Sequence, residues 1–213
     1  SLLAVARAGS ETEEEAKAKI DGFNQAYATK DEASRVTAVE SLAPVLHPSA
    51  TRVLVGLLTK DVEGVRIAAA NGLGRVADDV AIQGLSGALA ANKKMPEVQK
   101  AILSALGATD SEKALPALHK MFEEFKDEVA VAAINAAGKI ASPNSADALL
   151  DALHKGEMER TKADMSGGGG GVEKDRDIEA VFDPAKNALS NCTGGSEVTY
   201  KGWKDWLKKN LSK

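Results

Sequence analysis

Apolar residues recur in this chain as triplets at positions i, i+3 and i+4, and the triplets repeat about every 31 residues. Spacings of three and four residues place each triplet on one face of an α-helix, which then needs a neighbour to bury it. Five copies follow one another at intervals of 31 to 33 residues, and a sixth follows after a longer gap. The copies are Phe23/Ala26/Tyr27, Leu54/Leu57/Leu58, Leu85/Ala88/Leu89, Leu118/Met121/Phe122, Leu149/Ala152/Leu153 and Trp203/Trp206/Leu207.

A second family of helical segments alternates with the first and keeps its own register. Its members are 35–42, 66–73, 99–106, 130–137 and 182–189. Glycine follows the last apolar residue in three copies, as Gly74, Gly107 and Gly138. We expect these glycines to end their helices in the left-handed conformation and to let neighbouring backbones approach. Asp183-Pro184 predicts the start of the last segment, with aspartate as the N-cap and proline in the first turn.

Two antiparallel helices therefore form each repeat, and neither helix can bury its apolar face alone. Stacking of successive pairs has to supply the core, which predicts an all-α fold, an α-solenoid of helix pairs. The composition agrees, because the chain has 37 alanines but only four Phe, two Trp and two Tyr. Small side chains at this density suit closely packed helices better than strands.

The stretch from Asp61 to Gly74 resembles the short HEAT repeat of bacterial proteins, the class that includes phycobilisome-lyase-type HEAT-like repeats. It has the acidic turn, the Val65-Arg66 pair, an alanine pair and a final Leu-Gly. The resemblance covers about residues 12–156 and implies HEAT-like helix pairs.

The C-terminal end resembles a closing element of bacterial HEAT-repeat proteins, with a Thr193-Gly194 turn and a W-x-x-W helix. Cys192 stands where that pattern has leucine, which predicts a small buried apolar side chain. We expect Trp203 to be buried as a structural cap and Trp206 to be partly exposed. Many proteins of this type are exported, which tilts the expected localisation outward and leaves the compartment open.

Four segments are expected along the chain. Residues 1–11 form an N-terminal extension, either the remnant of a signal peptide or a frayed helical turn. Residues 12–156 form the HEAT-like repeats, 157–180 a flexible insertion that contains Gly167–Gly171, and 181–213 a final helix pair that caps the solenoid. The insertion is either a loop that closes over a ligand or, as we favour, a tolerated addition between repeats.

The charge and the reactive side chains argue against several functions. With 27 Lys and Arg against 31 Asp and Glu, the net charge of −4 argues against nucleic acid as a partner. A single cysteine and three histidines leave no zinc ligand set of the usual spacing, and we expect no metal or cofactor. No apolar run reaches the roughly 18 residues of a membrane span. We interpret His47, His119 and His154 as solvated surface residues, and we expect no catalytic group and no enzymatic activity.

A surface is therefore a better candidate site than a cluster. In a solenoid of helix pairs, one layer of helices lines a concave face that can receive a partner. The positions opposite the apolar triplets are small and nearly uncharged in the first three copies, and more polar in the later ones. The expected partner contacts are Asn24, Gln25, Val55, Thr59, Ser86, Ala90, His119, Glu123, Leu150 and His154. Tight curvature, which also favours small residues, is the competing explanation of this pattern.

These observations favour a non-enzymatic scaffold that binds a protein or peptide through its concave face. Two alternatives remain open at this point. The first is a HEAT-like lyase, a chaperone or another enzyme-associated module, which needs a pocket with acid and base groups. The second is a purely structural module of a larger envelope protein.

Overall fold

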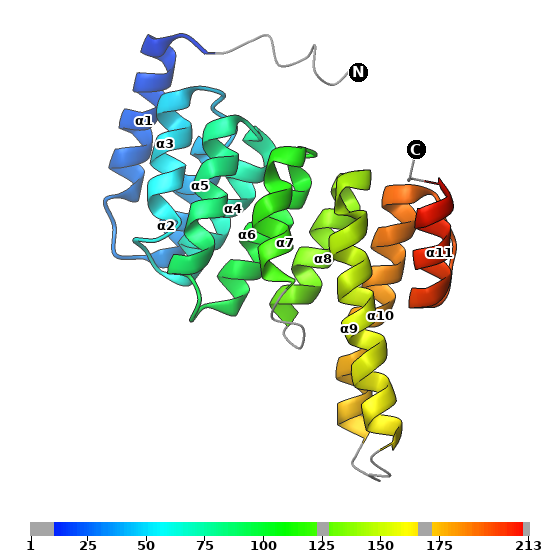
Figure 1. Cartoon of the computed structure of the whole chain (residues 1–213). Helices are drawn as coiled ribbons and strands as arrows, with labels where there is room; N and C mark the ends of the chain where they lie inside the picture. Colours follow the sequence, from blue (N-terminus) through cyan, green and yellow to red (C-terminus); the bar gives the residue numbers. More distant parts are fainter. Residues whose placement is uncertain (1–10, 123–127, 166–171, 211–213) are drawn as a thin grey trace. The chain divides into compact units, whose positions relative to one another are not determined.

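A computed structural model of the chain describes residues 11–122, 128–165 and 172–210, and for 159–165 and 172–182 it describes the backbone alone. The described residues form α-helices and short 3-10 helices, with no strand among them, so the predicted all-α architecture is confirmed (Figure 1). The chain divides into two compact units, Ser1–Thr109 and Asp110–Lys213. The sequence analysis did not predict this division within residues 12–156.

Unit 1 consists of three helix pairs in two layers. The first layer holds α1 (Glu13–Tyr27), α3 (Pro48–Leu57) and α5 (Asp79–Ala91), and the second holds α2 (Glu32–Leu42), α4 (Glu63–Val76) and α6 (Pro96–Ala108). Each helix packs against its pair and against the neighbouring helix of its own layer, for example α3 against both α4 and α5.

Helices of one layer run parallel, as stacked repeats require. Near the starts of α3 and α5, Thr51 Oγ1 lies 3.4 Å from Asp78 Oδ2. At their ends, Asn92 Nδ2 donates to the backbone oxygen of Leu58 at 3.0 Å. The starts of α3 and α5 therefore lie side by side, and so do their ends. Successive repeats are thus related by a translation, as expected of a solenoid.

The predicted apolar triplets supply the core between the layers. Leu54 and Leu85 are fully buried, and Phe23 is 5% exposed. The middle member varies, because Ala88 is buried as the pattern predicts, Leu57 is half-buried and Ala26 is exposed. Ala26 lies in α1, the first described helix of the unit, which packs only against α2 and α3 among the described elements.

The glycines of the second layer have one of their two expected roles. A Cβ on Gly74 would lie 2.9 Å from the Cα of Ala105, so Gly74 lets the backbones of α4 and α6 approach. The expectation that Gly74, Gly107 and Gly138 end their helices in the left-handed conformation is wrong, because α4 continues to Val76, α6 to Ala108 and α8 to Ile140. Left-handed backbone instead occurs three residues later in each copy. The residues that adopt it are Ala77, Asp110 and Ala141, with φ of 52°, 52° and 54°.

Unit 2 has the same two-layer construction. Its first layer contains α7 (Leu115–Met121) and α9 (Ala146–Met165), which follow the 3-10 helices η1 (Glu112–Ala114) and η2 (Pro143–Ser145), and also α11 (Tyr200–Asn210). The other contains α8 (Glu128–Ile140) and α10 (Val172–Thr193). The helices α8 and α10 also meet at a glycine, since a Cβ on Gly138 would lie 2.9 Å from the Cα of Ala188.

The helices next to the expected insertion are longer than the sequence indicated. Helix α9 reaches Met165 and α10 begins at Val172, so helical backbone occupies most of 157–180. The glycines Gly167–Gly171 lie outside the described residues. The expectation that Asp183-Pro184 starts a helix is wrong, because Pro184 lies inside α10. A proline within a helix removes one backbone hydrogen bond, which a long and well-packed helix can tolerate.

The last helix does not continue the repeat. The backbone N–H of Tyr200, at the start of α11, donates to Glu157 Oε1 at 2.7 Å, well along α9. The later residue Leu207 lies with Leu150, near the start of α9. Helix α11 therefore runs antiparallel to α9, whereas α3 and α5 run parallel.

A turn at Gly194, between α10 and α11, allows α11 to run antiparallel to α9. Gly194 adopts a φ of 75°, and its N–H donates to the backbone oxygen of Ser190 at 2.8 Å. Helix α10 packs on α8 and α9, and α11 packs on α9. This arrangement differs from the final pair expected over 181–213.

Candidate partner-binding surface

A ladder of polar side chains fixes the positions of the helices in unit 1. Arg35 pairs with Asp61 at 2.8 Å between Nη1 and Oδ1, and Arg66 Nη1 donates to Asn92 Oδ1 at 2.8 Å. Asn92 is fully buried, and its amide also donates to Leu58 and Ala88 backbone oxygens. A buried amide whose hydrogen-bonding groups all have partners orders the chain around it, so the ladder holds successive repeats in one register.

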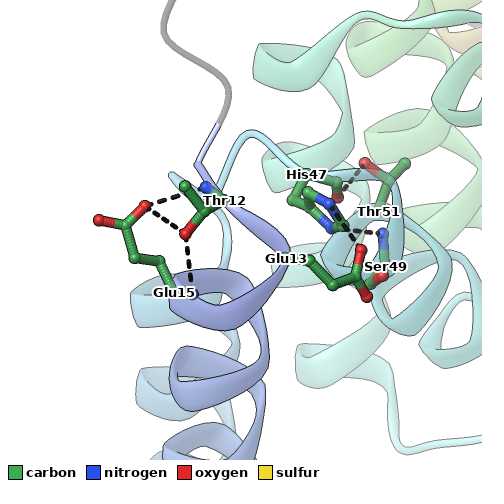
Figure 2. A network of polar contacts seen from close by, with 6 residues as sticks. All are labelled: Thr12, Glu13, Glu15, His47, Ser49 and Thr51. Atoms are coloured by element: carbon green, nitrogen blue, oxygen red, sulfur yellow. Dashed lines mark hydrogen bonds and ion pairs between the residues drawn. The ribbon is translucent and has the colours of Figure 1, made fainter.

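A second polar network joins the starts of α1 and α3 (Figure 2). His47 caps α3, because its Nδ1 accepts the backbone N–H of Ser49 at 3.2 Å. Its Nε2 lies 3.2 Å from a carboxylate oxygen of Glu13. A nitrogen that accepts from an N–H carries no proton, so the neutral ring that makes this cap has its hydrogen on Nε2, facing Glu13. His47 thus links two helices, and its interpretation as a solvated turn residue is wrong.

Four of the predicted partner contacts lie exposed on the first layer of unit 1. Asn24 and Gln25 project from α1, Thr59 follows α3, and Ala90 lies on α5. Ser86 and Val55 are half-buried. Val55 has a structural role, because a Cβ on Gly84 would lie 2.5 Å from one of its methyl groups. The valine side chain therefore fills the space that Gly84 leaves between α3 and α5.

Three glycines on this layer face open space, Gly22 in α1, Gly56 in α3 and Gly87 in α5. A Cβ added at any of them would meet no atom within 4 Å, and Gly56 and Gly87 stand at equivalent positions of successive triplets, two residues after Leu54 and Leu85. Their packing thus differs from that of Gly74, where the neighbouring helix leaves no room for a side chain. Packing within the unit therefore does not require glycine at positions 56 and 87, of which Gly87 is exposed and Gly56 half-buried.

The predicted contacts in unit 2 have different surroundings. Leu150 lines a groove, whereas His119 and His154 are half-buried. His119 Nε2 lies 3.0 Å from Ser145 Oγ, and burial lowers the pKa of its imidazole. His154 stacks on the ring of Tyr200 with 4.2 Å between centroids. Both histidines join helices of one layer, so their interpretation as solvated surface is wrong, and Glu123 lies outside the described residues.

The groove that Leu150 lines has a volume of about 650 Å³ and opens between the start of α9 and the second half of α11. Its apolar lining comes from Pro143, Ala146, Leu150 and Leu207, and Lys204 and Lys208 line it as well. Asn144 and Asp147 complete the lining. The periodic pattern identified Leu150 but missed the contribution of α11, because an apolar repeat does not reveal the direction of the last helix.

The closing element has the packing that the sequence predicts. Trp203 is fully buried, Trp206 is half-buried, and their rings meet edge to face with 6.0 Å between centroids. Cys192 is 5% exposed, and burial raises the pKa of its thiol to about 11. The thiol is thus protonated at neutral pH and acts as a small apolar group.

Neither a metal-binding group of side chains nor a membrane-spanning helix occurs within the described ranges. No group of three or more His, Cys, Asp and Glu side chains there is placed to hold a metal ion. In the same part of the chain, no helix combines the length and apolar character that crossing a membrane requires.

Comparison with known proteins identifies the repeat. The family model of HEAT repeats matches residues 20–95 and 87–165, more than half of the chain. A crystal structure of an engineered protein from the Northeast Structural Genomics Consortium is similar, with a TM-score of 0.45 and 22% identity over 84% of this chain and 86% of that one. A search of curated proteins gave no match. The chain is an α-solenoid that belongs to the HEAT-repeat family.

Proposed function

We propose that the chain is a non-enzymatic scaffold that binds a segment of another protein on the first layer of each unit, the side expected to be concave. HEAT repeats typically serve as scaffolds for protein interaction, which supports a protein partner. Asn24, Gln25, Thr59 and Ala90 offer a weakly charged, exposed surface in unit 1. The groove beside Leu150 offers a second surface in unit 2.

The unfilled space at Gly56 and Gly87 is the observation that carries this proposal. Glycine inside a helix is less stable than alanine by about 1 kcal/mol, and both positions have room for a Cβ. Packing within the unit thus does not explain why the less stable glycine occurs at these two positions. A partner that lies close against α3 and α5 would explain it. Helices approach most closely where side chains are absent, and an amphipathic helix in a groove is a common recognition mode.

The assignment of the chain to a subclass of HEAT repeats is also a proposal. We place the chain with the short HEAT repeats of bacterial proteins, whose acidic turn and Val-Arg pair occur here at Asp61 and Val65-Arg66. The ladder gives these residues a structural role, because Arg66 Nε donates to the backbone oxygen of Asp61. The C-terminal W-x-x-W element likewise has a packing role in Trp203.

Photo-crosslinking tests the proposed function. A benzophenone amino acid is placed at Thr59 or Ala90 on the first layer, and at Glu40 or Asn71 on the second as matched controls. All four positions are exposed. We expect one discrete adduct with a protein of the source organism from Thr59 and Ala90 only. Adducts from both layers alike, or none, would contradict a binding face on the first layer.

A further inference from the structure

The groove between α9 and α11 in unit 2 combines an apolar lining with unpaired positive charge. Leu150 is half-buried and Leu207 is 7% exposed, and both side chains line the groove. Lys204 and Lys208 are both exposed and lie one helical turn apart on α11. Residues four apart lie on the same face of a helix, so both ammonium groups can reach one bound segment.

The two lysines have no acidic partner within the described residues. Neither lysine has a carboxylate oxygen within 4.0 Å there, although Lys204 lies 5.6 Å from the centre of the Tyr200 ring. Asp147 is the one acidic residue in the lining, against two lysines. It lies in the first turn of α9, where a negative charge stabilises the positive end of the helix dipole. The groove therefore carries net positive charge.

From this lining we infer that the groove binds an acidic peptide segment of the partner, with an apolar side chain placed between two carboxylates. The apolar side chain would contact Leu150 and Leu207, and the carboxylates would pair with Lys204 and Lys208. A small free anion would use the charge but leave the apolar lining uncovered. This inference rests on the proposed function, because it names the chemistry of the partner for one of the two surfaces.

The shape of the site favours a peptide as the occupant. A volume of about 650 Å³ lies within the range of small-ligand sites, but the groove is open along one side rather than enclosed. An open groove can bind a peptide segment whose chain continues beyond the groove at both ends. Charge on the rim then mainly speeds association and selects the partner, while the apolar contact keeps the complex together.

Fluorescence polarisation tests this inference with a short fluorescein-labelled peptide of glutamate and leucine, and with a lysine and leucine peptide as the control ligand. The double variant Lys204→Glu/Lys208→Glu reverses the charge of the groove. Lys201→Glu/Lys209→Glu makes the same change in net charge on the same helix, outside the groove. Both variants change exposed side chains, and their circular dichroism melts show whether the fold is kept.

We expect the acidic peptide to bind wild-type protein and to bind the groove variant at least about tenfold more weakly, a loss of about 1.4 kcal/mol. The control variant should stay within about twofold of wild type, and Lys204→Gln/Lys208→Gln should give an intermediate loss because it removes charge without reversing it. Equal losses in both charge-reversal variants would overturn the inference, since they indicate general electrostatic attraction. Equal binding of the lysine and leucine peptide would overturn it as well.

Two further outcomes separate this inference from its alternatives. A copy of this chain is a possible occupant, because α1 begins with exposed Glu13, Glu14 and Glu15. Analytical ultracentrifugation without peptide tests for self-association. If the wild-type protein self-associates and Lys204→Glu/Lys208→Glu does not, the occupant of the groove is a second copy of this chain, and the inference of a partner peptide is overturned. If the acidic peptide fails to bind while Thr59 and Ala90 still crosslink a partner, this inference fails and the proposed function stands.

Discussion

Single non-glycine residues in left-handed backbone follow the second-layer helices α4, α6 and α8. Ala77 and Ala141 adopt φ of 52° and 54°, and each donates its N–H to a carbonyl four residues earlier. An L-residue in this conformation is less stable by about 1–2 kcal/mol, whereas glycine adopts it without the Cβ clash. Ala77→Gly and Ala141→Gly should therefore each raise the free energy of unfolding by about 0.5–1 kcal/mol in a urea titration.

Ala18→Gly is the matched control for these two variants. Ala18 is exposed inside α1, where glycine should lower stability by about 0.5–1 kcal/mol. If Ala77→Gly and Ala141→Gly lower stability as Ala18→Gly does, the left-handed helix ends are not present in solution.

Burial of His119 makes stability depend on pH. Because burial lowers the pKa of the folded imidazole, the unfolded chain binds more protons than the folded protein just below the ordinary value of about 6.5. The contribution of His119 is thus complete above that value and is lost as the pH falls through the lowered folded pKa. His119→Gln, which can keep a polar contact to Ser145, should show a smaller loss of stability between neutral and mildly acidic pH. Equal slopes for the two proteins would show that His119 is not buried as described.

The residue scale also shows the limits of reading the sequence. Gly74 and Gly138 were correctly predicted to bring backbones together, as their approach to Ala105 and Ala188 shows. The same glycines were wrongly expected to end their helices. A glycine in a sequence is compatible both with a helix end and with close backbone approach, and only the contact with the next repeat decides between these roles. The three histidines were misinterpreted for a similar reason, since their partners Glu13, Ser145 and Tyr200 lie far away in sequence.

At the scale of helices, two glycines with opposite surroundings test the packing. Gly87 lies inside α5 with open space around it, so Gly87→Ala should raise stability by about 0.5–1 kcal/mol. Gly74 lies against the backbone of Ala105, so Gly74→Ala forces α4 and α6 apart and should cost about 1–3 kcal/mol. Urea titrations of both variants measure the difference, and effects of the same sign would contradict the spacing of the helices.

Helix α11 is stabilised chiefly by one side chain. Trp203 is fully buried, so Trp203→Ala should cost about 3–5 kcal/mol, while Trp206→Ala should cost less because Trp206 is half-buried. Trp203→Phe keeps an aromatic ring and removes an indole N–H that has no partner among the described residues, so its loss should be smaller. Guanidinium titrations followed by circular dichroism measure these losses. Equal losses at the two tryptophans would contradict the packing of α11 on α9.

Helix periodicity identified most of the elements, and it failed where the repeat is broken. The triplets at Leu54, Leu85 and Leu149 mark helices of the first layer correctly. The start of α10 was misplaced because Asp183-Pro184 has the form of a helix start, yet the helix continues through it. The reversed direction of α11 could not be predicted, since an apolar triplet marks the buried face of a helix but not the direction in which the helix runs along its neighbour.

At the scale of the whole molecule, the family and the function rest on different observations. The repeat pattern and the HEAT family model agree on stacked helix pairs over most of the chain. The proposed binding surface rests on exposed residues and on unfilled space at Gly56 and Gly87, which the sequence suggested only as small residues opposite the core. The sequence named the layer that we propose as the binding face, while the open space at these glycines and the groove beside Leu150 required the structure.

The affinity of the crosslinked partner for variants of the two layers shows whether the partner binds the first layer. Thr59→Arg/Ala90→Arg places two large side chains on the first layer, and Glu40→Arg/Asn71→Arg places them on exposed positions of the second. Isothermal titration should show binding weakened at least about tenfold by the first pair, because the partner can no longer approach the bare helices, and by less than about twofold by the second. Equal affinity of wild type and Thr59→Arg/Ala90→Arg, or a larger loss in Glu40→Arg/Asn71→Arg, would contradict a scaffold that binds through its first layer.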